Sequence, residues 1–168
     1  MHPMEVRLRH PFKTLCLFLA FLFSTTAISL ALPAPMDDAD LMEKSDLVAL
    51  VRVLSVGCTS VTKDEQSGEV LPGYLATLQV LEVKKGDVKP GDEVLVTWHA
   101  IPTGIVGPWA VFYYPGEEVW THLTKRSGGV TYASSWWNAR GEPVKKAQTT
   151  ELPTTVGQTV TITTKPSE

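Results

Sequence analysis

The sequence predicts a mostly β protein, a small closed barrel of five strands preceded by a short helix. The segment Leu47–Val56 is almost free of polar residues and rich in β-branched ones, which is typical of a buried strand. This strand and the next one, Tyr74–Val83, each change the face that carries their apolar residues, near Val53 and at Val80-Leu81. Such a change indicates a bulge, and bulges let strands bend around a barrel. Later strands are short and bounded by Gly and Pro turns, as expected for a small β domain.

The start of the chain has the composition of a signal peptide. Three Lys or Arg residues precede the uncharged segment Thr14–Leu32, and Ser29-Leu30-Ala31 offers the small residues that a signal peptidase requires. We therefore predict a signal peptide over residues 1–31 and a periplasmic or secreted protein without stable membrane insertion after cleavage. The alternative is an uncleaved anchor, because the uncharged run Thr14–Met36 is long enough to span a bilayer.

Charge and cysteine content narrow the class of protein. The formal charge of −3 becomes −5 when the leader takes three basic residues and one acidic residue with it, so no nucleic-acid partner is expected. Cys16 leaves with the leader, and Cys58 is expected to be a small core residue without an internal disulfide. We predict one barrel domain over residues 36–145. The Thr- and Pro-rich tail, residues 146–168, is expected to be disordered or an edge strand.

The remaining elements follow from local patterns. Pro35–Asp46 places acidic residues before Lys44, which favours a short helix. The polar segment Thr59–Gly73 predicts a mobile hairpin loop between the first two strands. Three further strands are expected at Glu93–His99, Glu118–Thr124 and Val130–Trp137. The apolar loop Ala100–Trp109 is expected either to cover the barrel mouth or to bind a partner. The residues expected on the buried faces of the third and fourth strands are Val94, Val96, Trp98, Val119, Thr121 and Leu123.

Four short motifs between Asp40 and Glu142 follow one another in a particular order. They are Ser45-Asp46-Leu47-Val48, Val80-Leu81-Glu82-Val83-Lys84-Lys85-Gly86, Gly91-Asp92-Glu93-Val94 and Tyr114-Pro115-Gly116-Glu117-Glu118-Val119. Together they resemble the netrin-like domain of tissue inhibitors of metalloproteinases, and especially its disulfide-free bacterial secreted relatives. The resemblance implies a five-stranded OB-like barrel and an exported protein, with a secreted protease inhibitor as an alternative function. The Cys-x-Cys that begins the mature animal inhibitors and chelates zinc has no counterpart near Leu32.

The tryptophans gather in the second half of the folded region. They are Trp98, Trp109, Trp120, Trp136 and Trp137. Strand alternation places Trp98 and one member of the Trp136-Trp137 pair in the core, and the others either line a contact surface or plug the barrel ends. We predict a ligand-binding surface on the loop Pro102–Trp109 and the strands beside it. Its predicted ligand-binding residues are Trp109, Trp120, His122, Trp136 and Trp137.

Other polar residues give no catalytic signature. His99 and His122 lie opposite the apolar faces of their strands and would approach each other if those strands were neighbours. A third metal ligand with recognisable spacing is missing, so no metal residue is assigned, and a metal-binding periplasmic protein stays an alternative. The adjacent acids Glu117 and Glu118 are expected to be solvated, whereas Arg52 is expected to reach the barrel rim or pair with an acid.

The function predicted from the sequence is that of a binding or interaction module. A nucleophile elbow, a phosphate-binding glycine loop and a helical His-Glu pair are all missing, so no enzyme activity, catalytic residue or cofactor is expected. The expected partner is an unknown protein or small molecule in the exported compartment.

Overall fold

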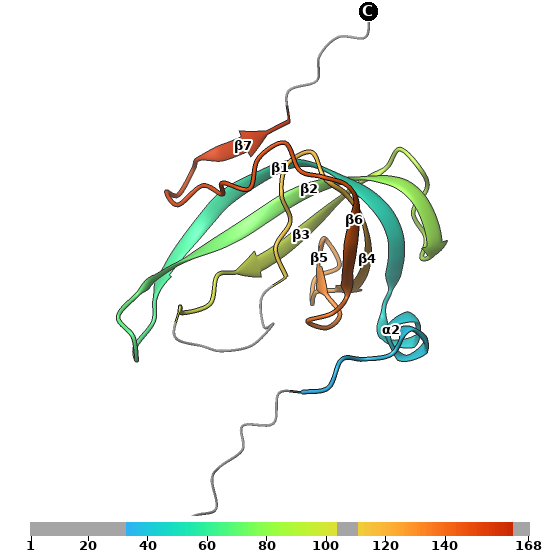
Figure 1. Cartoon of the computed structure of the whole chain (residues 1–168), viewed down its shortest axis with the longest axis horizontal. Coiled ribbons are helices and arrows are strands. Elements are labelled where there is room, and N and C mark those ends of the chain that lie inside the picture. The colour runs from blue at the N-terminus through green and yellow to red at the C-terminus, as the bar shows by residue number, and fades with distance from the viewer. Residues whose placement is uncertain (1–32, 104–110, 163–168) are drawn as a thin grey trace, which may run out of the picture. The chain divides into compact units, whose positions relative to one another are not determined.

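The computed structural model describes residues 33–103 and 111–162, and every element named below lies in the unit Ala34–Glu168 (Figure 1). The elements are α2 (Asp38–Lys44), β1 (Leu47–Lys63), β2 (Val70–Lys85), β3 (Glu93–His99), β4 (Glu118–Lys125), β5 (Thr131–Ser134), β6 (Arg140–Lys145) and β7 (Thr159–Thr161). The protein is therefore mostly β, as the sequence predicts. In these two ranges, no helix has both the length and the apolar character that crossing a membrane requires.

The strands form one sheet in the order β6-β4-β5-β3-β2-β1-β7. Strand β1 also pairs with β4, so that β1, β2, β3, β5 and β4 make a ring of five strands. The pairings within this ring are antiparallel except that of β3 with β5. That parallel contact is short, because only Leu95 and Val96 pair across it.

Strand β1 changes partners along one of its edges. Leu47–Arg52 pairs with β4, and Ser55–Gly57 pairs with β7, while β2 lies along the other edge. Between these two stretches, the Val53 N–H donates to the Glu117 carbonyl at 3.0 Å, and the Val53 carbonyl accepts from the Gly116 N–H at 2.9 Å. In Figure 1, β1 is the long curved ribbon that leads from α2 to the hairpin with β2.

The pairing of β1 with β2 confirms the two predicted changes of face. The register shifts between Val53 and Ser55, where Leu54 is the extra residue. A second shift leaves Leu81 as the extra residue on β2. Each bulge turns the apolar residues that follow it to the other face of the strand and increases the local bend.

The interior of the ring is apolar. Strands β3 and β4 alternate buried and more exposed residues, and all six of the residues expected on their buried faces are buried. Cys58 is also buried, as predicted. An aromatic cluster fills one part of the core, with ring centroids 5.2 Å apart for Tyr74 and Trp98 and 5.5 Å apart for Trp98 and Tyr113. Rings at such distances contribute beyond the area they bury.

The hairpin between β1 and β2 differs from the prediction. The expected loop Thr59–Gly73 is wrong, because β1 continues to Lys63 and β2 begins at Val70. Only the tip is a turn, in which the Asp64 carboxylate accepts from the Ser67 N–H at 2.6 Å and from its hydroxyl at 2.8 Å. The β1 side of the arm is Thr59–Lys63, mostly polar and exposed, and it pairs with Val70–Gly73 of β2, so it lacks the apolar alternation by which strands are recognised.

The part of the chain after β4 also differs from the prediction. The strand expected at Val130–Trp137 stops at Ser134, because the chain then turns and the Ala139 N–H donates to the Trp136 carbonyl at 3.1 Å. Strand β6 was not predicted, and it pairs with the outer edge of β4. The short strand β7 lies in the C-terminal tail and pairs with β1. The helix falls inside its predicted range, and Asp37 caps it by accepting from the Asp40 N–H at 2.8 Å.

Candidate functional site

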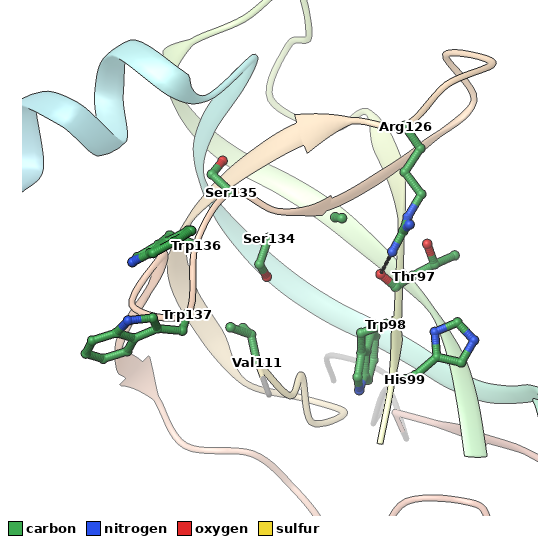
Figure 2. A pocket seen from close by; sticks show the side chains of 10 residues that line it. Thr97, Trp98, His99, Val111, Arg126, Ser134, Ser135, Trp136 and Trp137 are labelled. Carbon is green, nitrogen blue, oxygen red and sulfur yellow. Dashed lines mark hydrogen bonds between the residues drawn. The ribbon is translucent and has the colours of Figure 1, made fainter. Parts of the chain in front are cut away.

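A pocket of about 360 Å³ opens where β3 and β5 separate (Figure 2). One wall is the end of β3, residues 97–99, and the other is the end of β5 with the turn that follows it, residues 133–137. Val111 and Arg126 complete the lining. Figure 2 shows Trp136 and Trp137 on one side of the pocket, and Arg126, Thr97, Trp98 and His99 on the other.

The pocket exists because the two strands pair over only two residues and then follow different neighbours. Beyond Val96, β3 stays paired with β2, so that Trp98 lies opposite Tyr74. Beyond Tyr132, β5 stays paired with β4, so that Ser134 lies opposite Leu123. The two strand ends therefore diverge, and side chains rather than backbone hydrogen bonds fill the space between them.

Trp136 and Trp137 reach the pocket from the turn between β5 and β6. The Trp136 indole N–H donates to the Ala34 carbonyl at 3.3 Å, and Asn138 exchanges two hydrogen bonds with the Met36 backbone, at 2.8 and 3.2 Å. These contacts hold the turn against the segment that precedes α2. The expectation that one of these tryptophans enters the core is wrong, because the strand that would carry it inward ends at Ser134.

Trp98 forms the opposite, buried side of the pocket. Its side chain stacks in the core with Tyr74 and Tyr113, and the residue is 9% exposed. Among the described residues, its indole N–H is buried without a hydrogen-bond partner. An unpartnered buried donor is unusual in a folded protein and costs free energy.

The polar groups of the lining are held by their neighbours. The Arg126 guanidinium donates to the Thr97 carbonyl at 3.1 Å, which ties the β4–β5 loop to β3. The Ser134 hydroxyl lies 3.2 Å from the Tyr113 hydroxyl, which is also 2.6 Å from that of Thr121. Burial raises the pKa of Tyr113, so this phenol stays protonated at neutral pH. Among the described residues, no Asp or Glu lines the pocket.

Trp120 and His122 do not join the pocket. Both lie on the outer face of β4, and neither belongs to the pocket lining. The Lys84 ammonium lies 4.0 Å from the centroid of the Trp120 ring, a distance typical of a cation–π contact. Burial lowers the pKa of His122, whose imidazole also has a hydrogen bond with the backbone of Leu41 in α2. The fifth tryptophan, Trp109, lies outside the described residues.

The two histidines are not neighbours. Strand β5 lies between β3, which carries His99, and β4, which carries His122. The His99 ring lies over Gly73, since a Cβ at that glycine would be 3.0 Å from the imidazole and 2.2 Å from the Ser60 hydroxyl. In residues 33–103 and 111–162, no three His, Cys, Asp or Glu side chains come together as a metal site would require.

Sequence reasoning missed Arg126, Thr97 and the two serines of the lining. Arg126 precedes Ser127-Gly128-Gly129 and has the pattern of an ordinary exposed turn residue. Its place in the pocket depends on Thr97 and Tyr132 coming together from 35 positions apart in the chain. Local pattern contains no signal for such a contact.

Fold and pocket define a mostly β protein with a ring of five strands and an aromatic-lined pocket at one opening between them. Comparisons with protein-family models, with curated proteins and with solved structures gave no significant match.

Proposed function

We propose that this chain is an exported binding module built on an OB-like barrel, and that its ligand occupies the pocket between β3 and β5. The observation that carries the proposal is the distribution of tryptophan. Four tryptophans lie in the described residues, and three of them, Trp98, Trp136 and Trp137, line this one pocket. Tryptophan is enriched where proteins bind their partners, because its large ring offers contact area at a low cost in conformational entropy.

The size and rigidity of the pocket support a small ligand. A volume of about 360 Å³ lies within the range of about 300–1,000 Å³ usual for small-molecule sites. One wall is a strand, and the other is a turn held by hydrogen bonds to the segment before α2. A site that is already formed loses less entropy on binding than one that must order its walls.

The ring of strands supports the OB-like part of the proposal. A closed five-stranded arrangement with one short parallel contact agrees with the netrin-like resemblance of the sequence. Ligands of OB barrels lie on the face of strands 2 and 3 and against the loops between strands 1 and 2 and between strands 4 and 5. The pocket is lined by β3 and by Arg126 of the β4–β5 loop, so it lies where OB barrels bind their ligands. This similarity is an analogy of fold alone.

Indole N–H resonances test the proposal directly. We would assign them in ¹⁵N-labelled protein by Trp→Phe substitutions, and titrate the protein with a panel of oligosaccharides, short peptides and small organic acids. A binding compound is expected to shift the resonances of Trp98, Trp136 and Trp137 and to leave that of Trp120 in place. Trp137→Ala is expected to weaken binding at least about fivefold, since anchor side chains contribute about 1 kcal/mol or more.

Trp120→Ala is the matched control, because it removes the same side chain outside the pocket. A panel that shifts only Trp120, or none of the four indoles, would contradict the proposal. So would equal losses of affinity in the two alanine variants.

A further inference from the structure

Resting on the proposed function, we propose that the ligand is a small organic acid with a flat apolar body, whose carboxylate pairs with Arg126 while its body lies among the tryptophans. Three features of the pocket support this class of ligand: the charge of its lining, the position of the Arg126 guanidinium and its two unlike sides.

The charge of the pocket is opposite to that of the chain. The whole chain has a formal charge of −3, yet the part of the lining that the structure describes contains Arg126 and no acidic residue. Its other polar groups are hydroxyls and an imidazole, which donate or accept, and indole N–H groups, which only donate. Arg126 is exposed and forms no ion pair with a carboxylate of the described residues, and such a cation at the edge of a pocket favours an anionic ligand over a cationic or neutral one.

The Arg126 guanidinium is positioned before any ligand arrives. One of its terminal nitrogens donates to the Thr97 carbonyl at 3.1 Å, and Figure 2 shows the guanidinium directed toward the β3 side of the pocket. A guanidinium has five N–H groups in a fixed fork, so donors remain for both oxygens of a carboxylate. The contact with Thr97 reduces the side-chain entropy that binding would otherwise cost.

The rest of the pocket fits a flat apolar body. Trp136 and Trp137 lie on one side of the pocket and Trp98 lies on the other, so aromatic residues belong to both sides of its lining (Figure 2). The buried N–H of Trp98 has no partner among the described residues, and Figure 2 shows it at the end of the indole that is turned away from Arg126. A neutral sugar would also stack on tryptophan, but its many hydroxyl donors would find no carboxylate acceptor in this lining.

Phenylacetate and phenylacetamide test this inference, because they share a ring and differ in charge. Dissociation constants would be measured from the indole N–H shifts at low ionic strength. Phenylacetate is expected to bind at least about tenfold more tightly than the amide, and added salt is expected to reduce the difference. Arg126→Gln is expected to lower the affinity for the acid to that for the amide. Arg126→Lys, which keeps the charge and loses the fork, should give an intermediate affinity.

Lys125→Gln is the matched control, since it removes one positive charge from the adjacent exposed position outside the lining. It should leave both affinities unchanged. Equal binding of acid and amide with shifts at Trp136 and Trp137 would overturn the inference and leave the proposed function standing. If neither probe moves a pocket indole, and neutral members of the wider panel do, the ligand is not an acid. If nothing in the panel moves them, the proposed function fails as well.

Discussion

The adjacent residues Glu117 and Glu118 have different roles that depend on distant partners. Glu117 is 1% exposed, its carboxylate pairs with Arg140, and one of its oxygens accepts from the Tyr114 N–H at 3.0 Å. Glu118 pairs with Arg52 at 2.8 Å in a more open position, which confirms the prediction that Arg52 finds an acid. The expectation that both acids are solvated is wrong, because Arg140 comes from β6, a strand without a clear sequence signal.

Removing the cation from each pair distinguishes the two roles. Arg140→Met leaves the Glu117 carboxylate buried without its counter-charge, and we expect the free energy of unfolding to fall by about 3–5 kcal/mol. Arg52→Met removes a cation whose side chain is 38% exposed, and Glu118 keeps Lys145 at 3.5 Å, so the expected loss is at most about 1 kcal/mol. Urea unfolding followed by circular dichroism measures both.

A further substitution checks the cause of the loss. Glu117→Gln in the Arg140→Met background removes the unpaired buried charge and should recover part of the lost stability. Equal losses in the two arginine variants would show that burial of Glu117 does not decide the strength of its pair.

At the scale of the elements, strands with regular alternation could be predicted and the others could not. The range Glu93–His99 matches β3 residue for residue, because one face of that strand meets the core and the other does not. The hairpin arm beyond Cys58 was missed because neither of its faces meets the core, and Val61 and Val70 are 46% and 64% exposed. Such an arm is held by cross-strand pairs, which a single stretch of sequence does not reveal.

The tip of that arm also fixes the chain that follows β3. One Glu69 carboxylate oxygen accepts from the Thr103 N–H at 2.9 Å, and the other accepts from the Thr103 hydroxyl. Both contacts lower the pKa of Glu69, and the hydroxyl contact has the larger effect. The hydrogen bonds therefore favour the ionised acid and join two loops that are 34 positions apart in the chain.

This junction should depend on pH in a defined direction. Because the pKa of Glu69 is lower in the folded protein, the stabilisation is complete above the unfolded value of about 4.3 and is lost as the pH falls through the folded value. The amide proton shift of Thr103, followed by NMR, is expected to titrate with a midpoint below that of an unfolded glutamate. Glu69→Gln should abolish this titration, and Thr103→Val should raise the pKa of Glu69.

Glu65→Gln is the control, because it changes a neighbouring exposed acid of the same turn. A Thr103 titration that persists in Glu69→Gln, or that disappears in Glu65→Gln, would contradict the assignment.

At the scale of the whole molecule, β1 connects most of the sheet. It pairs with β2, β4 and β7, and the turn before β4 bonds to it at Val53. The ring, like the pocket, requires contacts between segments far apart in the sequence. The sequence could indicate that a strand is buried and bends. It also indicated Trp136 and Trp137 as candidate binding residues. It did not indicate which strand pairings would place Trp120 and His122 away from them.

Such connectivity predicts cooperative unfolding. Tryptophan fluorescence and far-ultraviolet circular dichroism should report the same urea midpoint, because losing β4 or β7 from β1 removes pairing from the strand that β2 also needs. Refolding is expected in the range of milliseconds to seconds, as for other folds dominated by distant pairings. Two separated transitions, with the fluorescence change preceding the loss of strand signal, would show that the second half unfolds independently.

Because β3 and β5 pair over so short a stretch, the width of the pocket and its chemistry are determined by different parts of the structure. Its width follows from the paths of two strands that stay paired with β2 and β4, whereas its selectivity resides in side chains at the strand ends and in a turn. Exchanging Arg126 or the serines alters the charge offered to a ligand without requiring either strand to move. A chain of this topology is therefore able to acquire a new ligand through a few surface substitutions while its framework stays the same.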